Sequence, residues 1–253
     1  MRRVLTLLLT ILLLCSTAPA SAGETIRIVT EGAYPPFNYL DKNGQPAGFD
    51  VEIARALCDA MGASCTMELA KWEELLPGLT EGKFDVIVAS MARTPEREAV
   101  ADFSQYYYRS RSAFVADPRR EFIQTPKGLS GWTLAAQAGT VQADHIAATY
   151  GQTAKIVLAP TLTDALRMLA EHEVDAVLAD CLTSYSFLQT EEGTPFDFVG
   201  VPLPEENPSS RACIAVRKGN GKLLQAINDA IKTIRIDGTY DRINRKYFPF
   251  SIY

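Results

Sequence analysis

The chain has few of the residues and motifs that build metal centres or covalent active sites. It has two histidines in 253 residues, and no Cys and His spacing resembles a zinc site. It has no Gly-x-Ser-x-Gly elbow, no phosphate-binding loop and no paired Cys and His motif. The net charge of −5 provides no basic field for nucleic acid or an anionic membrane. These absences disfavour a metal site, a covalent mechanism and a nucleic-acid partner.

Long apolar runs are also scarce, and the clearest one lies at the N-terminus. Val4 to Leu14 follows two arginines and precedes the small residues Ala20-Ser21-Ala22. This order predicts a secretory signal peptide over residues 1–22. The run is much shorter than the roughly 20 residues that span a bilayer. We therefore expect the mature protein to be exported and soluble.

Four cysteines follow the predicted signal peptide. In an oxidising compartment, nearby cysteines are expected to bond. Cys58 lies late in a helical stretch and Cys65 opens the next strand, so we expect a Cys58–Cys65 disulfide across a short turn. Cys181 and Cys213 either form a second bridge or remain buried thiols.

Strand and helix patterns alternate along the mature chain. Strands are expected at 26–30, 65–69, 84–89, 112–116, 133–136, 155–158, 176–179 and 214–216. Helices are expected at 48–61, 72–81, from 94 onward, and at 141–150, 163–171, 182–191, 222–236 and 239–247, with Asp50 as the N-cap of the first. This alternation predicts an α/β protein with mostly parallel sheets.

Two segments echo each other, Gly82 to Ser90 and His172 to Asp180. Each has a charged turn, an Asp, a β-branched run, and then Ala with a polar residue. The echo suggests two lobes of the same design. Ligands of open α/β sheets lie beyond the carboxyl ends of the strands. Ser90 and Asp180 would then face a shared cleft and hold a small polar molecule.

Arg97 is a candidate for holding an anionic group. It lies in the helix that starts at Thr94, close to the loop containing Ser90 and Ala92. A guanidinium holds a carboxylate bidentately, and the amides of Ser90 and Ala92 could add donors. Alternatively, Arg97 is an exposed helix residue paired with a neighbouring glutamate.

The segment from Gln137 to Gln142 is a second candidate anion site. It joins an expected strand to an expected helix, and Gly139 permits close approach of the backbone. A helix N-terminus offers free amides and a positive dipole end to an anion. The same pattern also fits a plain turn in which Thr140 caps the helix.

Acidic and aromatic residues nearby are candidates for holding a cation. Asp180 could bind an ammonium group or cap the helix that follows it. Glu31 follows the first strand and could face a second cation or water. Tyr34 and Trp72 could stack on a ligand side chain or simply pack in the core.

Taken together, these segments resemble the polar amino-acid family of periplasmic solute-binding proteins, the receptors of ABC importers. The resemblance spans essentially the whole mature chain. Its markers are Tyr34-Pro35-Pro36-Phe37, Gly48-Phe49-Asp50, Trp72 to Leu79, Phe84 to Ile87, Thr94 to Arg97, the strand entry Asp102-Phe103-Ser104, Gly139-Thr140, Asp175-Ala176-Val177, and Asp237-Gly238-Thr239-Tyr240 before Tyr247-Phe248.

The resemblance implies a two-lobe flytrap fold with two hinge crossovers. Lobe 1 would comprise residues 23–110 and 212–253, and lobe 2 residues 111–211, with hinges near 108–112 and 210–213. It also implies a periplasmic monomer that uses no cofactor or metal. This monomer would bind an amino acid and deliver it to an ABC transporter permease in the inner membrane.

The family also implies roles for individual residues. The Arg matching Arg97 holds the ligand α-carboxylate, and the Asp matching Asp180 holds the α-ammonium. Ala92 stands where relatives often have Ser or Thr, so one hydroxyl is missing. The implied ligand-binding set is Glu31, Tyr34, Trp72, Ser90, Ala92, Arg97, Gln137, Thr140, Gln142 and Asp180.

Two of these positions bear on the ligand. Glu31 lies where receptors for cationic amino acids carry an acid, and Trp72 matches the aromatic that stacks on the ligand side chain. This favours Arg, Lys, ornithine or an Arg-derived opine. The alternatives are a receptor for Gln, His or Glu, or a periplasmic dehydratase of the cyclohexadienyl type on the same fold. That enzyme would need a general acid such as Glu31 or Asp180.

Overall fold

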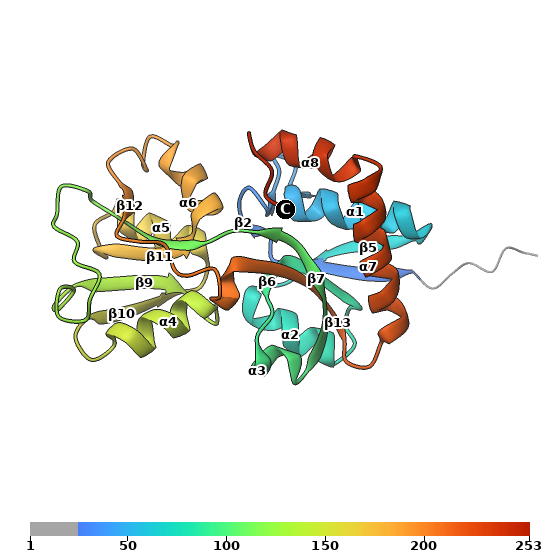
Figure 1. Ribbon diagram of the computed structural model, residues 1–253, viewed down its shortest axis with the longest axis horizontal. Helices are drawn as coiled ribbons and strands as arrows, with labels where there is room; N and C mark the ends of the chain where they lie inside the picture. Colours follow the sequence, from blue (N-terminus) through green and yellow to red (C-terminus); the bar gives the residue numbers. More distant parts are fainter. Residues whose placement is uncertain (1–24) are drawn as a thin grey trace, which may run out of the picture.

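Two five-stranded sheets, each covered by helices, lie side by side along the long axis of the molecule (Figure 1). The computed structural model describes residues 25–253, so the predicted signal peptide over residues 1–22 lies outside the described residues. Each sheet with its helices forms one lobe, which confirms the predicted two-lobe α/β fold. Within 25–253, no helix has the length and apolar character needed to cross a membrane.

The first sheet has helices on both faces. Its strand order is β5 (Cys65–Leu69), β1 (Ile26–Thr30), β6 (Val86–Ala92), β13 (Arg211–Arg217) and β7 (Ala101–Arg109). The helices are α1 (Phe49–Met61), α2 (Trp72–Thr80), α3 (Pro95–Glu98), α7 (Gly221–Ile236) and α8 (Thr239–Tyr247). Along β6, Val86 and Val88 pack toward α1 and α7, whereas Ile87 packs toward α2. A strand buried on both faces in this way requires the continuous apolar run seen in the sequence.

The second sheet repeats this arrangement. Its strand order is β10 (Lys155–Ala159), β9 (Thr133–Gln137), β11 (Ala176–Asp180), β8 (Ser112–Ala116) and β12 (Asp197–Val199). The helices are α4 (Val141–Tyr150), α5 (Leu162–Ala170) and α6 (Cys181–Leu188). Leu178 packs with the residues of α4, and Val177 packs with those of α5. Both faces of β11 are therefore buried, like those of β6.

One strand in each sheet runs against the other four. β13 pairs antiparallel with β6 and β7, and β8 pairs antiparallel with β11 and β12. Each of these two strands begins just after the chain has crossed from the other lobe. The two lobes therefore share one topology, in which β6 and β11 hold equivalent positions.

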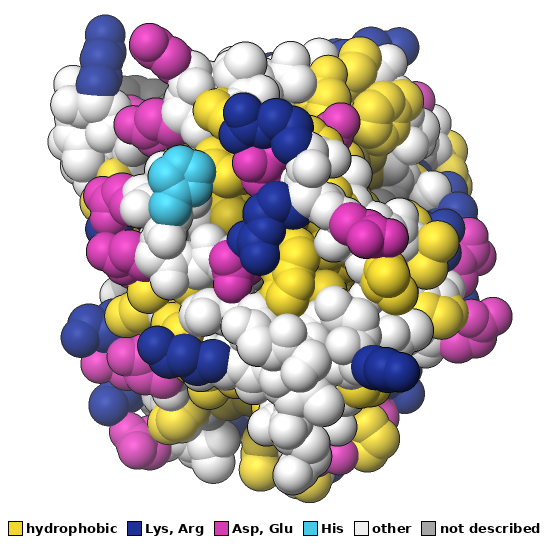
Figure 2. Space-filling view, turned by 90° about the vertical axis from the view of Figure 1, so that its left-hand side faces the viewer, with side chains coloured by type: hydrophobic (Ala, Val, Ile, Leu, Met, Phe, Trp, Pro, Cys, Tyr) yellow, Lys and Arg dark blue, Asp and Glu magenta, His cyan; other side chains and the backbone are white. Residues whose placement is uncertain are grey.

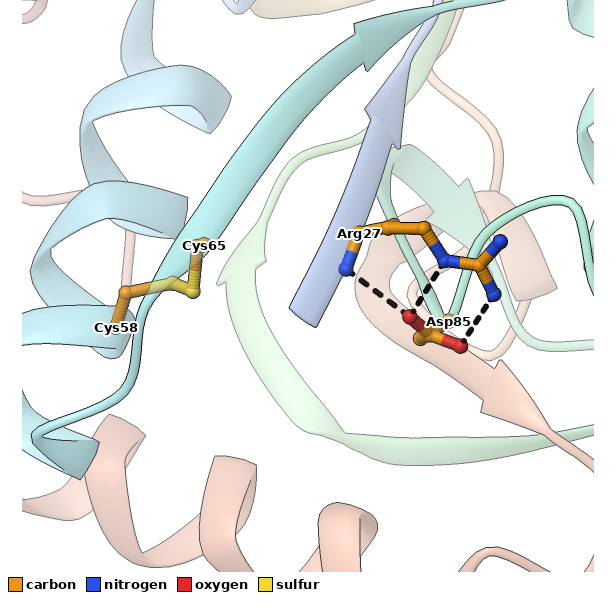
Figure 3. The surroundings of a disulfide bond; sticks show 4 residues. All are labelled: Arg27, Cys58, Cys65 and Asp85. Atoms are coloured by element: carbon orange, nitrogen blue, oxygen red, sulfur yellow. Dashed lines mark hydrogen bonds and ion pairs between the residues drawn. A yellow bond between two sulfur atoms is a disulfide. The ribbon is translucent and has the colours of Figure 1, made fainter. Parts of the chain in front are cut away.

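Asp85 and Asp175, the aspartates of the two echoing segments, have the same structural role. Asp85 Oδ2 accepts from the amide of Arg27 (3.0 Å), and the Asp85 amide donates to the Arg27 carbonyl (2.8 Å). Asp175 Oδ2 accepts from the amide of Thr133 (2.7 Å), and the Asp175 amide donates to the Thr133 carbonyl (2.8 Å). Each Asp thus fixes the entry of the neighbouring strand, β1 or β9. The guanidinium of Arg27 also donates two hydrogen bonds to the Asp85 carboxylate (Figure 3).

The turns before these aspartates also match. Gly82 (φ 74°) and His172 (φ 58°) each lie three residues before the Asp and adopt the left-handed conformation. This conformation is strained for His172 but not for glycine. The echo seen in the sequence therefore reflects one strand-entry geometry used in both lobes.

The predicted role of Asp50 as a helix cap is wrong. Gly48 is the N-cap of α1, and Asp50 is fully buried in the first turn. A Cβ on Gly48 (φ 114°) would lie 2.3 Å from the carbonyl oxygen of Phe37, so glycine alone fits there. Because Gly48 lies so close to Phe37, the helix begins before Asp50, and the Asp50 carboxylate points into the core.

Some strands differ from expectation. The strand predicted at 84–89 runs from Val86 to Ala92, β7 was anticipated only through the strand entry Asp102-Phe103-Ser104, and β12 was not predicted. A small sheet of β2 (Ala33–Tyr34), β3 (Asn38–Leu40) and β4 (Pro46–Ala47) was also missed, as was a short 3-10 helix at Pro208–Ser210. β7 is an edge strand that mixes buried and exposed positions, so its sequence lacks the apolar run of a central strand.

The predicted disulfide is confirmed. Cys58 near the end of α1 bonds to Cys65 at the start of β5 (Figure 3). Cys181 and Cys213 are not bonded to each other, so a second bridge is excluded. Burial raises the pKa of the Cys181 thiol to about 12 and that of Cys213 to about 11. Both thiols are therefore protonated at neutral pH.

The strand-entry role of Asp85 gives the first testable prediction. Asp85→Ala leaves the Arg27 amide without its acceptor, so the free energy of unfolding should fall by about 1–3 kcal/mol. Denaturant unfolding measures this change. The matched control Asp59→Ala, at an exposed position of α1, should change the same quantity by less than about 0.5 kcal/mol. Equal effects of the two substitutions would contradict the assigned role.

Candidate functional site

A pocket lies between the two lobes, at the carboxyl ends of the strands. All ten residues that the sequence singles out line it, together with Ala89, Tyr108 and Val141, which it did not. The lining residues from the first lobe are Glu31, Tyr34, Trp72, Ala89, Ser90, Ala92, Arg97 and Tyr108. Those from the second are Gln137, Thr140, Val141, Gln142 and Asp180.

Arg97 is fixed at the pocket wall by backbone carbonyls. Its guanidinium donates to the carbonyl of Ala92 (2.7 Å) and, from across the cleft, to that of Gly139 (3.0 Å). Within the described chain it forms no ion pair with a neighbouring glutamate, so the exposed-helix alternative is wrong. Burial lowers the pKa of Arg97 to about 10, which still leaves it protonated at neutral pH.

At least four hydrogen bonds between residues of the described chain join the lobes across the cleft. The Gln137 amide donates to Glu31 Oε1 (2.6 Å), and the Trp72 indole donates to the Gly139 carbonyl (3.0 Å). The third is the Arg97–Gly139 bond, and the fourth runs from the Thr163 hydroxyl to the Ala33 carbonyl (3.2 Å). The pocket is therefore bridged on the sides where these residues meet.

Glu31 is a carboxyl group held in a poorly solvated position. Burial raises its pKa to about 7, the Gln137 hydrogen bond works against this rise, and the charge of Glu73 adds to it. One carboxyl oxygen is engaged by Gln137. A cation in the pocket would stabilise the ionised form.

Asp180 has two tasks at the end of β11. Its Oδ1 accepts from the amides of Leu182 (2.8 Å) and Thr183 (3.2 Å), so it caps α6 as one of the sequence interpretations proposed. It is 3% exposed and also lines the pocket. Burial raises its pKa to about 6 despite a hydrogen bond from Ser110. Capping and facing the pocket are therefore compatible for this residue.

Ser90 offers the pocket acceptors rather than donors. Its amide donates to the Tyr107 hydroxyl oxygen (3.0 Å), and its own hydroxyl donates to Asp50 Oδ2 (2.9 Å). The expectation that the Ser90 amide adds a donor for an anion is therefore wrong. Sequence reasoning missed this contact, because it indicated only the entry of β7 and did not bring Tyr107 to Ser90.

The start of α4 forms the facing wall. Thr140 caps the helix through the amide of Ala143 (3.2 Å) and donates its hydroxyl to the Gln137 carbonyl (2.7 Å). Its side chain is thus occupied, and the anion-attracting feature of this wall is the helix N-terminus itself. Gln142 donates to the Ser112 hydroxyl (2.9 Å).

Charged side chains also occur away from the cleft. On the end of the molecule drawn in Figure 2, basic and acidic side chains are interspersed with apolar ones. Among residues 25–253, no group of three or more His, Cys, Asp or Glu is placed to hold a metal ion. The charged lining of the cleft is Glu31, Asp180 and Arg97.

Comparison with known proteins gives a consistent result. Residues 26–250 match the bacterial extracellular solute-binding proteins, family 3. The L-arginine-binding protein of Pseudomonas aeruginosa is 33% identical over 244 residues, which cover 92% of this chain and 91% of that protein.

Two solved structures are similar over nearly the same length. An ancestral arginine-binding protein bound to arginine has a TM-score of 0.81 at 31% identity, covering 88% of this chain and 98% of that one. An ancestral amino acid-binding protein, described as a precursor of cyclohexadienyl dehydratase, has a TM-score of 0.78 at 28% identity, covering 88% and 95%. All of these relatives are named for binding, not for catalysis.

The Gln137–Glu31 bond gives a prediction about ionisation. A donor stabilises the charged carboxylate, so Gln137→Leu should raise the pKa of Glu31 above its value of about 7. Carbon-detected NMR titration of the side-chain carboxyl measures this. Thr163→Val removes another bond across the cleft and should leave that pKa unchanged. A Glu31 that titrates near 4.5 in the unaltered protein would contradict the analysis.

Proposed function

This chain belongs to the bacterial extracellular solute-binding proteins of family 3, and from this we propose that it is a receptor for a cationic amino acid. The ligand is arginine, lysine, ornithine or an arginine-derived opine. The proposal includes a periplasmic location and delivery of the ligand to an ABC transporter permease.

Charge complementarity carries the proposal. The charged groups that line the pocket are two acids, Glu31 and Asp180, and one base, Arg97. A cationic amino acid carries two positive groups and one carboxylate, which is the opposite set. Burial makes ionisation of both acids unfavourable. A ligand with two positive groups would stabilise both ionised carboxylates, while its own carboxylate binds Arg97. A neutral side chain would leave Glu31 uncompensated.

The positions of these groups suggest an orientation for the ligand. Arg97 and the N-terminus of α4 would hold the α-carboxylate. Asp180 would hold the α-ammonium, with the Ser90 hydroxyl oxygen as a second acceptor. The side chain would then extend toward Glu31, with the Trp72 ring beside it.

Binding and closure would be coupled. The lobes are joined by two crossings, from β7 to β8 and from β12 to β13, near the proposed hinges at 108–112 and 210–213. A ligand that touches Arg97 on one side and Asp180 on the other favours the closed state. The permease would recognise the closed surface. The lobe boundaries 23–110 with 212–253, and 111–211, belong to this proposal.

Two alternatives have specific support. A receptor for glutamine or another polar amino acid would use the same carboxylate and ammonium sites. A dehydratase of the cyclohexadienyl type is favoured by the Glu31 pKa of about 7, which suits a general acid. Turnover of prephenate or arogenate distinguishes that enzyme from a receptor, which turns over neither.

Charge removal at Glu31 tests the proposed ligand class. Glu31→Gln should weaken arginine binding by about 10- to 100-fold, because a charged hydrogen bond is lost. Glutamine binding should change far less. Titration calorimetry on the mature protein measures both affinities. The control Glu73→Gln removes an exposed acid next to the pocket and should cost less than about threefold. Equal losses for arginine and glutamine on Glu31→Gln would refute the assignment.

The raised pKa of Glu31 also predicts a pH dependence. A cationic side chain favours the ionised carboxyl, so its pKa falls when the ligand binds and a proton is released. Arginine affinity should therefore rise from about pH 5 to about pH 8 and level off above the ligand-free pKa. Glutamine has an α-ammonium group for Asp180 but no cationic side chain for Glu31. Its affinity should therefore rise less than that of arginine over the same pH range. Parallel profiles for the two ligands would contradict the role of Glu31.

A further inference from the structure

Asp50 is a buried carboxylate that has no role in the ligand contacts proposed above. It is 0% exposed in the first turn of α1. Its partners are three neutral donors: the Tyr107 hydroxyl (2.6 Å), the Asn38 amide (2.8 Å) and the Ser90 hydroxyl (2.9 Å). Within residues 25–253 no Lys, Arg or His pairs with it. A buried charge held in this way is costly, so its position requires an explanation.

The hydrogen-bond directions around Asp50 determine what Ser90 can do. A serine hydroxyl has one hydrogen, and here that hydrogen is donated to Asp50. The Ser90 amide hydrogen is donated to the Tyr107 oxygen, whose own hydrogen goes to Asp50. Both donors of Ser90 are therefore engaged by Tyr107 and Asp50. What remains for the pocket is a lone pair of the hydroxyl oxygen.

The same network holds Ser90 in an unusual backbone conformation. Ser90 has φ 53°, in the left-handed region that side chains rarely adopt. Such strain persists where surrounding contacts determine it, and it clusters at functional sites. The second partner, Asn38, accepts from the amide of Gly32 (2.8 Å), the residue after Glu31. Asp50 thus lies behind two walls of the first lobe that line the pocket.

We propose that Asp50 is a positioning residue for the ligand ammonium: by taking the hydroxyl hydrogen of Ser90, it makes that hydroxyl an obligate acceptor in the pocket. Asp50 does not touch the ligand. It sets the polarity of Ser90 and keeps its strained backbone in place. This inference rests on the proposed function, because it requires a ligand with an α-ammonium group.

The electrostatics agree with this role. Burial raises the pKa of Asp50 to about 6, against hydrogen bonds from Tyr107, Asn38 and Ser90 that lower it, so the group is ionised at neutral pH. Its charge is also felt at Asp180 across the cleft, where it helps raise the pKa. A ligand ammonium beside Ser90 would lie between these two carboxylates.

Asp50→Asn tests the proposal at constant shape. An amide in place of the carboxylate presents a donor to at least one partner, which lets Ser90 turn its hydrogen to the pocket. The probes are L-arginine and 5-guanidinopentanoic acid, which lacks only the α-ammonium. The measured quantity is the ratio of their affinities. We expect this ratio to fall at least about tenfold in Asp50→Asn, because a favourable acceptor becomes a misplaced donor.

The ratio separates positioning from general damage. A purely structural role for Asp50 would weaken both probes by the same factor, and an unchanged ratio would overturn the proposal. Asp85→Asn, at the other end of β6, is the matched control and should leave the ratio unchanged. If Asp50→Asn does not fold, Ser90→Ala keeps the Asp50 charge and removes the hydroxyl that Asp50 orients. It should shift the ratio in the same direction, and no shift would again overturn the proposal.

The outcomes also separate this inference from the proposed function. If the unaltered protein does not bind L-arginine but binds L-glutamine, the cationic ligand is wrong. The same ratio is then measured with L-glutamine and its analogue without the α-amino group. If it binds no α-amino acid, both the proposed function and the role of Asp50 fail.

Discussion

Buried carboxylates around one cleft are the constraint on which this molecule depends. Asp50 and Asp180 are almost completely buried and Glu31 is partly so, and burial raises the pKa of all three. Each carboxylate accepts hydrogen bonds from neutral donors: hydroxyls and a side-chain amide for Asp50, helix amides for Asp180, and a side-chain amide for Glu31. Neutral donors hold a carboxylate in place but do not cancel its charge. The remaining negative potential is what a cationic ligand can use.

The two lobes reach the cleft by the same construction. In each, an Asp just before the central strand, β6 or β11, fixes the entry of the neighbouring strand, β1 or β9, and the chain then runs along the buried central strand to the cleft edge. The residues at that edge differ: Ser90 on β6 and Asp180 on β11. A common scaffold therefore delivers different chemistry to the two sides, which suits a ligand with different groups at its two ends.

Much of the fold and the pocket lining could be predicted because the relevant residues lie where strands end. Glu31, Asp180 and Gln137 each follow or end a strand, and ligands of open α/β sheets bind there. The Cys58–Cys65 bridge followed from proximity along the chain. Apolar runs located the central strands but missed the edge strand β7, whose pattern mixes buried and exposed residues.

Hydrogen-bond direction could not be read from the sequence. The roles of Asp50 and Ser90 depend on Tyr107, which is distant in sequence and lies on the edge strand β7. Local capping rules placed Asp50 at the helix start, but the close approach of Gly48 to Phe37 makes Gly48 the N-cap instead. Local rules failed where tertiary contacts, rather than the neighbours in sequence, decide the environment of a polar group.

The most direct test of the central claim is thermal unfolding of the mature protein with a panel of amino acids and opines. A ligand that binds only the folded state at 100 times its dissociation constant adds about 2.7 kcal/mol of stability. The account predicts the largest stabilisation with arginine, lysine, ornithine or an arginine-derived opine. Stabilisation only by glutamine or acidic amino acids would contradict the charge complementarity, and no stabilisation by any of them would contradict the receptor function.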